Sequence, residues 1–209
     1  MGRNAGWVTA AAALASQAGE IGPDLIYLPE RDFDEAAFLQ DVERLWARGR
    51  GVVVVVSEGI HGPGGKPLVP PIFQTGRSTY FGDVSAHLAQ LVVKELGVKA
   101  RSEKPGLAGR CSIHWRSSID CREAEEAGRA AVQAVLNGQT GVMPAFRRIS
   151  DQPYQSETFL APIREVMLTE RTMPEEYINE AGNGVTEAYL QWLRPLMGEE
   201  LPELVTFQD

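Results

Sequence analysis

Residues 51–59 read GVVVVVSEG, and this stretch decides the fold class. Five consecutive valines place an apolar side chain on both faces of a strand, because successive side chains point to opposite sides. Such a strand is typical of a parallel sheet whose two faces are both covered by helices. The sequence therefore predicts a central parallel strand over 52–56 that ends at Ser57-Glu58-Gly59.

The segments before the valines alternate between helical and strand patterns. An alanine-rich segment after a glycine-containing turn predicts a helix that begins near Gly6 or Trp7. The stretch DLIYLPE (24–30) predicts a short buried strand, and residues 32–49 predict an amphipathic helix that ends at Gly49. The expected inner face of this second helix consists of Phe38, Val42, Leu45 and Trp46. Alternating helices and strands indicate an α/β fold with three layers and a mostly parallel sheet.

The pattern changes after the valine strand. Residues 59–82 are rich in Gly and Pro and have no periodicity, so they predict a long loop. Asp83 or Ser85 is the expected N-cap of a helix that ends at Gly97. The next segment, through residue 111, is irregular apart from a short strand expected at its start.

The last part of the chain begins with a long predicted helix. Ser117 or Ser118 is its expected N-cap, and Asn137-Gly138 its end. Its expected inner face consists of Ala124, Ala127, Ala131 and Val135. A strand over 141–148 follows. Beyond it the sequence predicts a tail with helical pieces near 162–168 and 185–193.

Charge and cysteine content exclude several classes of protein. The 209 residues carry a formal net charge of -8, which argues against a general nucleic-acid binder, since such a protein needs a basic face. The two cysteines match neither a metal site nor a disulfide framework, which favours a cytoplasmic protein. Spanning a membrane takes roughly 20 consecutive apolar residues, and the sequence contains no run that approaches this length.

A few residues are candidates for binding an anion. The glycine-rich turn before the first helix offers free backbone N–H groups beside Arg3. Glu58 follows the valine strand at its carboxyl end, where α/β proteins bind ligands. Arg101 and Arg110 stand in one Gly/Pro-containing loop, and two guanidinium groups that converge on a phosphate would bind it strongly. The residues alone predict an α/β domain with a candidate site for a phosphorylated small molecule, and nothing more specific.

Several motifs, taken together and in order, resemble the phosphofructokinase family. They are Met1-Gly2-Arg3 followed by NAGW, DLIYLPE, the valine strand with its SEG ending, GLAGRC (106–111) and SSIDCREAEEAGRAAVQAVLNGQTG (117–141). The resemblance covers nearly the whole chain. The SEG form with its long following loop is most similar to the pyrophosphate-dependent branch.

This resemblance implies a role for each matching residue. Met1, Gly2 and Arg3 match the motif that grips fructose 6-phosphate, and Glu58 matches a glutamate that binds a sugar hydroxyl. The last two matches, Arg101 and Arg110, are to arginines that hold the 6-phosphate, one of which comes from a neighbouring subunit in some members. Leu107 departs from the pattern, since the family usually has Tyr or His there, and one hydrogen bond to the phosphate or sugar is expected to be lost or replaced.

A second departure concerns the other substrate. The glycine-rich donor motif of the family and its aspartate-containing segment, which supplies the catalytic base and binds Mg²⁺, have no counterpart in this sequence. The resemblance therefore implies the C-terminal half of a longer enzyme, with Met1 as an internal methionine. It also implies three parts: a fructose 6-phosphate-binding lobe (1–110), a helix and strand that pack toward the donor lobe (111–150) and a C-terminal helical tail (151–209).

The implied reaction is transfer of a phosphoryl group from pyrophosphate to the 1-hydroxyl of fructose 6-phosphate in glycolysis. The isolated chain, without catalytic or metal-binding residues of its own, is expected to be inactive. Two alternatives stay open at this point. One is half of an ATP-dependent 6-phosphofructokinase, and the other is a non-catalytic sugar-phosphate-binding or regulatory subunit. The expected partners are further copies of the chain or a separate donor-lobe chain, with no nucleic acid and no membrane.

Overall fold

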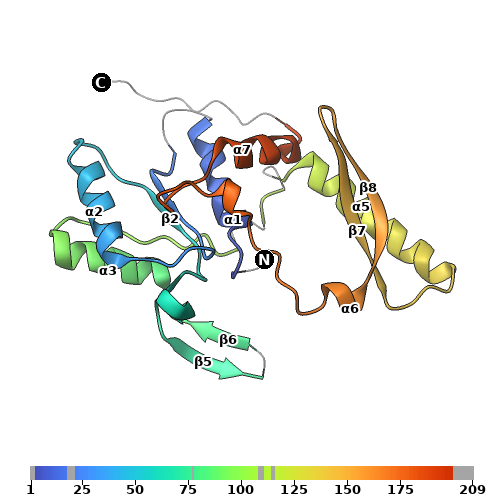
Figure 1. Cartoon of the computed structure of the whole chain (residues 1–209), viewed down its shortest axis with the longest axis horizontal. Helices are drawn as coiled ribbons and strands as arrows, with labels where there is room; N and C mark the ends of the chain where they lie inside the picture. Colours follow the sequence, from blue (N-terminus) through green and yellow to red (C-terminus); the bar gives the residue numbers. More distant parts are fainter. Residues whose placement is uncertain (1–2, 18–21, 77, 108–110, 114–115, 200–209) are drawn as a thin grey trace. The chain divides into compact units, whose positions relative to one another are not determined.

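The computed structural model describes residues 3–17, 22–76, 78–107, 111–113 and 116–199. The chain forms two compact units (Figure 1). Unit 1 combines the chain up to Gly106 with the later segment Thr172–Tyr189. Unit 2 combines Leu107–Arg171 with Leu190–Pro202. The three functional parts implied by the sequence have boundaries at residues 110 and 150. These boundaries are a separate division of the chain and stay predictions.

Unit 1 has a small parallel sheet at its centre. Strand β1 (Leu25–Tyr27) pairs in parallel with β2 (Val54–Val56), and Leu25 lies opposite Val54. The helices of this unit are α1 (Trp7–Ala10), continued by a 3-10 turn over Ala11–Gln17, α2 (Glu35–Trp46) and α3 (Val84–Leu96). The parallel pairing and the helices confirm the alternation expected from the sequence.

A buried apolar cluster joins the sheet to α2 and α3. Its members are Leu25, Tyr27, Phe33, Phe38, Val42, Leu45, Ile60, Val84, Leu88 and Val92. The rings of Tyr27 and Phe33 meet edge to face with centroids 5.0 Å apart, a favourable aromatic geometry. Asp34 and Asp83 cap α2 and α3 by accepting backbone N–H groups, and Gly97 ends α3 in the left-handed conformation.

Two expectations for unit 1 are wrong in detail. Trp46 is 47% exposed, because it follows Leu45 directly and so points about 100° away from the buried stripe of α2. The valine strand is shorter than predicted, since only Val54–Val56 pair with β1, and Val53 is 47% exposed. A broad parallel sheet with both faces covered is therefore absent from the described residues, whose four sheets have two strands each.

The predicted long loop at 59–82 is also wrong, because most of it forms antiparallel hairpins. Strands β3 (His61–Gly62) and β4 (Lys66–Pro67) flank a short 3-10 turn over Pro63–Gly65. Strands β5 (Pro71–Thr75) and β6 (Ser78–Phe81) form a second hairpin, which extends beyond α3 in Figure 1. Glycines at positive φ, such as Gly76 at 53°, allow these turns without strain.

Unit 2 is a helix packed against a hairpin. Helix α5 (Ser118–Leu136) is capped by Ser117, which accepts backbone N–H groups of the first turn, as expected. Strands β7 (Val142–Asp151) and β8 (Tyr154–Pro162) pair in antiparallel fashion along their length. The sequence predicted β7, although as a shorter strand, and missed β8. Helix α6 (Ile163–Val166) follows β8 and matches one of the expected helical pieces.

The contacts of α5 differ from the predicted ones. Glu123 accepts hydrogen bonds from the hydroxyls of Tyr154 and Ser156, each 2.5 Å, and so ties the helix to β8. Ala124 is exposed and Val135 is 72% exposed, so both are wrongly assigned to the inner face. The buried residues of the helix are Ile119 and Ala134, so its inner face is rotated from the predicted stripe toward the side of Ala127, which is half-buried.

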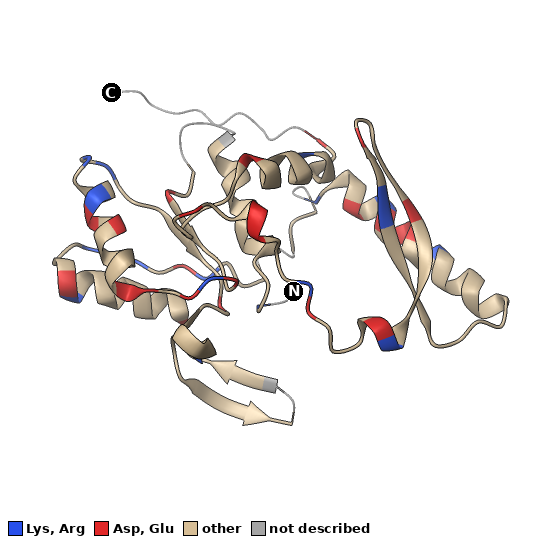
Figure 2. Cartoon of the chain, in the orientation of Figure 1, with Lys and Arg blue, Asp and Glu red and all other residues tan. Residues whose placement is uncertain are grey.

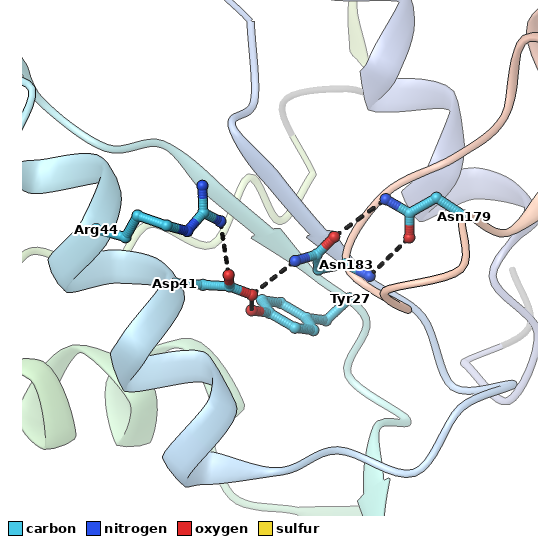
Figure 3. A network of polar contacts seen from close by, with 5 residues as sticks. All are labelled: Tyr27, Asp41, Arg44, Asn179 and Asn183. Carbon is cyan, nitrogen blue, oxygen red and sulfur yellow. Dashed lines mark hydrogen bonds and ion pairs between the residues drawn. The ribbon is translucent and has the colours of Figure 1, made fainter.

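The later segment of unit 1 includes a 3-10 turn (Glu175–Tyr177) and leads into α7 (Glu187–Leu193), the second expected helical piece. A polar network fastens this segment to the core (Figure 3). Asp41 accepts hydrogen bonds from Tyr27, Arg44 and Asn183, and Asn179 holds Asn183 in turn. Burial alone would raise the pKa of Asp41, but these hydrogen bonds outweigh it and hold the pKa below its ordinary value.

Candidate functional site

A cavity of about 160 Å³ in unit 1 brings together two of the residues singled out in the sequence. Arg3 and Glu58 both line it. Its remaining lining residues are Asn4, Gly59, Ile60, His61, Gly65, Pro67, Leu68, Val69, Phe81 and Val84. The cavity therefore lies between the turn that precedes α1, the SEG turn after β2 and the two hairpins.

The SEG turn holds the backbone of Arg3 close to it. The buried hydroxyl of Ser57 donates a hydrogen bond to the carbonyl oxygen of Arg3 at 3.0 Å. A Cβ atom on Gly59 would lie 2.0 Å from the same oxygen, so only glycine permits this approach. The SEG sequence thus positions Arg3 as well as supplying Glu58.

The turn that carries Arg3 is also fixed from the β1 side. One oxygen of Glu30, which follows Pro29 after β1, accepts the backbone N–H of Gly6 and that of Met173, each at 2.8 Å. The hydroxyl of Tyr189 donates to the carbonyl oxygen of Trp7 at 2.6 Å. Glu30 was not among the candidates from the sequence; the signal was a carboxylate at the end of a buried strand, next to a helix start.

The cavity presents one positive and one negative side chain. Across the part of the chain that the structure describes, no carboxylate forms an ion pair with Arg3, and Glu58 has no hydrogen bond or ion pair. A cation that keeps its charge suits an anionic group, and a carboxylate that accepts hydrogen bonds suits hydroxyls. Arg3 and Glu58 are therefore suited to a small ligand that carries both an anionic group and hydroxyls.

His61 lines the same cavity, although its sequence neighbours gave no reason to select it. Its Nδ1 lies 3.2 Å from a carboxylate oxygen of Asp32 and 3.2 Å from the carbonyl oxygen of Gly62. These contacts use Nδ1 and leave Nε2 as the second polar atom of the ring. A ring held in this way is a further candidate for binding a hydroxyl or a phosphate oxygen.

The structure does not bring Arg101 into this cavity. Arg101 lines a separate, more open groove of about 490 Å³ along α3, with Gln90, Lys94, Ser102 and Glu103. Leu107 is 67% exposed, and its side chain offers no hydrogen bond. Met1, Gly2 and Arg110 lie outside the described residues, so their assignments stay predictions.

The described residues also contain no group of three or more His, Cys, Asp or Glu side chains that could hold a metal ion. Nor is any described helix long and apolar enough to cross a membrane.

A model of the phosphofructokinase family, "Phosphofructokinase", matches residues 1–135. The chain belongs to the phosphofructokinase family. The match begins at the Met-Gly-Arg motif and extends through α5 almost to its end.

Several of the individual relatives are pyrophosphate-dependent enzymes. The chain is 39% identical to the pyrophosphate–fructose 6-phosphate 1-phosphotransferase of Xanthomonas campestris pv. campestris over 204 residues, covering 97% of the chain and 49% of that protein. It is 37% identical to the enzyme of the same name from Rhodospirillum rubrum, covering 100% and 54%. Both alignments include nearly all of this chain.

A solved structure shares the fold. The crystal structure of a pyrophosphate-dependent phosphofructokinase from Nitrosospira multiformis superimposes with a TM-score of 0.78 at 35% identity, over 100% of this chain and 49% of that one. The chain thus spans about half the length of the relatives that it matches. It has a phosphofructokinase-like structure, and it is similar to diphosphate-dependent members of the family.

Proposed function

We propose that the chain supplies the fructose 6-phosphate-binding half of a 6-phosphofructokinase that uses pyrophosphate as phosphoryl donor. The observation that supports this most directly is the cavity shared by Arg3 and Glu58. Within the described parts of the chain, it combines a cation that forms no ion pair with a carboxylate that accepts no hydrogen bond. Fructose 6-phosphate has the anionic group and the hydroxyls that these two side chains recognise.

In this role the residues of the chain position the acceptor sugar. Arg3 binds the anionic ligand, and Glu58 accepts a hydrogen bond from a sugar hydroxyl. Fixing the sugar in this way presents its 1-hydroxyl for in-line attack on the donor phosphorus, and positioning supplies much of the catalysis in phosphoryl transfer. The catalytic base, the donor site and the Mg²⁺ ligands belong, in this proposal, to the half of the relatives that this chain does not match.

Arg101 and Arg110 are assigned to the 6-phosphate. Since Arg101 lies outside the cavity lined by Arg3, we assign it to the site of a neighbouring subunit in a homo-oligomer. Lys94 lines the same groove but forms an ion pair with Glu95 at 2.9 Å, so Arg101 is the residue assigned to the phosphate. A cytoplasmic location goes with this function, and the two cysteines are free thiols.

Isothermal titration of the 209-residue chain with fructose 6-phosphate tests the site. Arg3→Ala is expected to weaken binding by about 1.5–3 kcal/mol, the range for a hydrogen bond to a charged group. Glu58→Gln is expected to weaken it by a smaller amount, since an amide oxygen still accepts. The matched controls are Arg48→Ala and Glu43→Gln, both exposed on or just after α2. Unchanged affinity in both site variants refutes the proposal.

Two further measurements test the proposal that the donor site and the catalytic base lie outside this chain. The pure chain, given fructose 6-phosphate, pyrophosphate and Mg²⁺, is expected to form no product, and measurable turnover would refute the assignment of the donor site to another half. The mass of the native polypeptide in its source cells then separates the alternatives. A polypeptide about twice as long, the expectation for one more domain of ordinary size, indicates one intact kinase.

A native mass of 22.9 kDa would instead favour a non-catalytic sugar-phosphate-binding subunit with a separate donor-site chain.

The exposed apolar side of α5 supports a partner in either case. Val132, Val135 and Leu136 are 62%, 72% and 74% exposed, and no charged residue stands between 130 and 146 (Figure 2). Exposed apolar surface of this kind marks interaction sites, here the proposed contact of 111–150 with the donor lobe. The choice of pyrophosphate over ATP rests on the SEG form of the sequence and on the pyrophosphate-dependent relatives.

A further inference from the structure

The guanidinium group of Arg3 is held by the β5–β6 hairpin. Its Nη1 donates a hydrogen bond of 2.6 Å to the backbone carbonyl oxygen of Thr79. Its Cζ lies 4.8 Å from the centre of the Phe81 ring, within the range of a cation–π contact. Neither partner carries a formal charge, so the contacts orient the guanidinium while its positive charge stays available to a ligand.

The hairpin takes part in the site through the same ring. Phe81 lines the cavity together with Arg3 and Glu58. A planar guanidinium that lies over an aromatic face keeps its N–H groups directed along the plane. The backbone of Arg3 is fixed separately by Ser57. Backbone and side chain of Arg3 are thus held from two different segments, the SEG turn and the hairpin.

We propose that Phe81 is a positioning residue for Arg3. Its ring and the Thr79 carbonyl hold the guanidinium at the wall of the cavity, so that an incoming sugar phosphate meets an oriented cation. Without the ring, Arg3 would reach its binding geometry only part of the time. Removing a cation–π contact at a partly exposed site is expected to lower the affinity for the ligand by about threefold to tenfold.

The hairpin supplies its own control. Phe73 and Tyr80 form an aromatic pair with ring centres 6.2 Å apart, and they are 60% and 57% exposed. Neither lines the cavity. Phe73→Leu therefore removes an aromatic ring from the same hairpin without touching Arg3. Phe81→Leu removes the ring that faces Arg3, and Phe81→Tyr keeps it.

The test combines a spectroscopic signal with ligand binding. In the 209-residue chain with ¹⁵N-labelled arginine, the Nε–Hε resonance of Arg3, assigned by its loss in Arg3→Lys, reports the ring-current shift of Phe81. Phe81→Leu is expected to abolish this shift and to weaken fructose 6-phosphate binding threefold to tenfold. Phe81→Tyr and Phe73→Leu are expected to preserve both.

The ligand part of the inference rests on the proposed function, and the two readouts separate their failures. An unchanged Arg3 resonance in Phe81→Leu overturns the positioning role, whatever happens to binding. A second outcome is that Phe81→Leu abolishes the ring-current shift of Arg3 but the wild-type chain does not bind fructose 6-phosphate. This result supports the contact between Phe81 and Arg3 and refutes the proposed function. In the Arg3→Lys background, Phe81→Leu is expected to have no further effect on affinity. A full additional loss there overturns the positioning role, since independent effects add.

Discussion

Glu30 connects the start of α1 to the later segment of unit 1, and its replacement is a direct test of how the site is built. One oxygen of its carboxylate accepts the N–H of Gly6 and the N–H of Met173, both at 2.8 Å. These two donors are 167 positions apart in the sequence, from 6 to 173. Among the described residues, Glu30→Ala removes the one side chain that accepts hydrogen bonds from both.

The expected cost follows from the two hydrogen bonds. A bond to a charged group contributes about 1.5–3 kcal/mol, and the lower value applies because Oε2 of Glu30 is buried without a hydrogen-bond partner among the described residues, which offsets part of the gain. The loss of both hydrogen bonds in Glu30→Ala is expected to lower the free energy of unfolding by about 3 kcal/mol. Glu30→Gln keeps a neutral acceptor, for which each bond contributes about 1 kcal/mol, so the expected decrease is about 1 kcal/mol.

Urea denaturation of the 209-residue chain measures both values, provided that the slope against urea stays constant. Glu43→Ala, an exposed glutamate on α2, is the matched control and is expected to change stability by less than about 0.5 kcal/mol. Since Gly6 follows Arg3 in the same turn, Glu30→Ala should also weaken fructose 6-phosphate binding. A decrease in unfolding free energy below about 1 kcal/mol for Glu30→Ala would refute this reasoning.

Three other predictions concern the core, the SEG turn and the exposed helix. Asp41→Ala should lower the free energy of unfolding at pH 7 by about 2–3 kcal/mol, since Asn183 loses its charged acceptor; urea denaturation measures this. Because its pKa is lowered by folding, the contribution of Asp41 is complete above the ordinary value of 3.8 and lost as the pH falls below it, so the difference from wild type should shrink there. Gly59→Ala should displace the carbonyl of Arg3 and weaken fructose 6-phosphate binding by calorimetry, while a full-affinity variant would contradict the close approach. Val135→Lys should reduce self-association of the isolated chain in analytical ultracentrifugation without changing its melting temperature, because this side chain is 72% exposed.

The sequence correctly predicted helix ends and short strands that are specified by residues close together in the chain. Asp83 and Ser117 cap their helices because a side-chain oxygen and a backbone N–H two or three residues away are the only partners required. Gly97 ends α3 because glycine alone adopts the left-handed conformation at no cost. The strand at β1 followed from a short apolar run, and its parallel pairing with β2 from the helix between them.

The hairpins could not be read in the same way. Strands β5 and β8 contain polar and proline residues without regular alternation, and their pairing depends on partners reached through turns. The exposed side of α5 shows the same limit, because periodicity defines an apolar stripe but not which part of it a neighbour covers. Here the hairpin contacts the helix through Glu123, away from Val135.

The sequence by itself determined the family, through motifs at Met1-Gly2-Arg3, Ser57-Glu58-Gly59 and residues 106–111, and with it the residues to examine. Only the tertiary structure placed Arg3 and Glu58 at one cavity, added Glu30 and Phe81 as supports of Arg3, and left Arg101 in a separate groove. The physical reason is the range of the interactions. A cap or a turn is specified by residues a few positions apart, whereas these contacts join segments from 24 to 143 positions apart, which come together only when the core has formed.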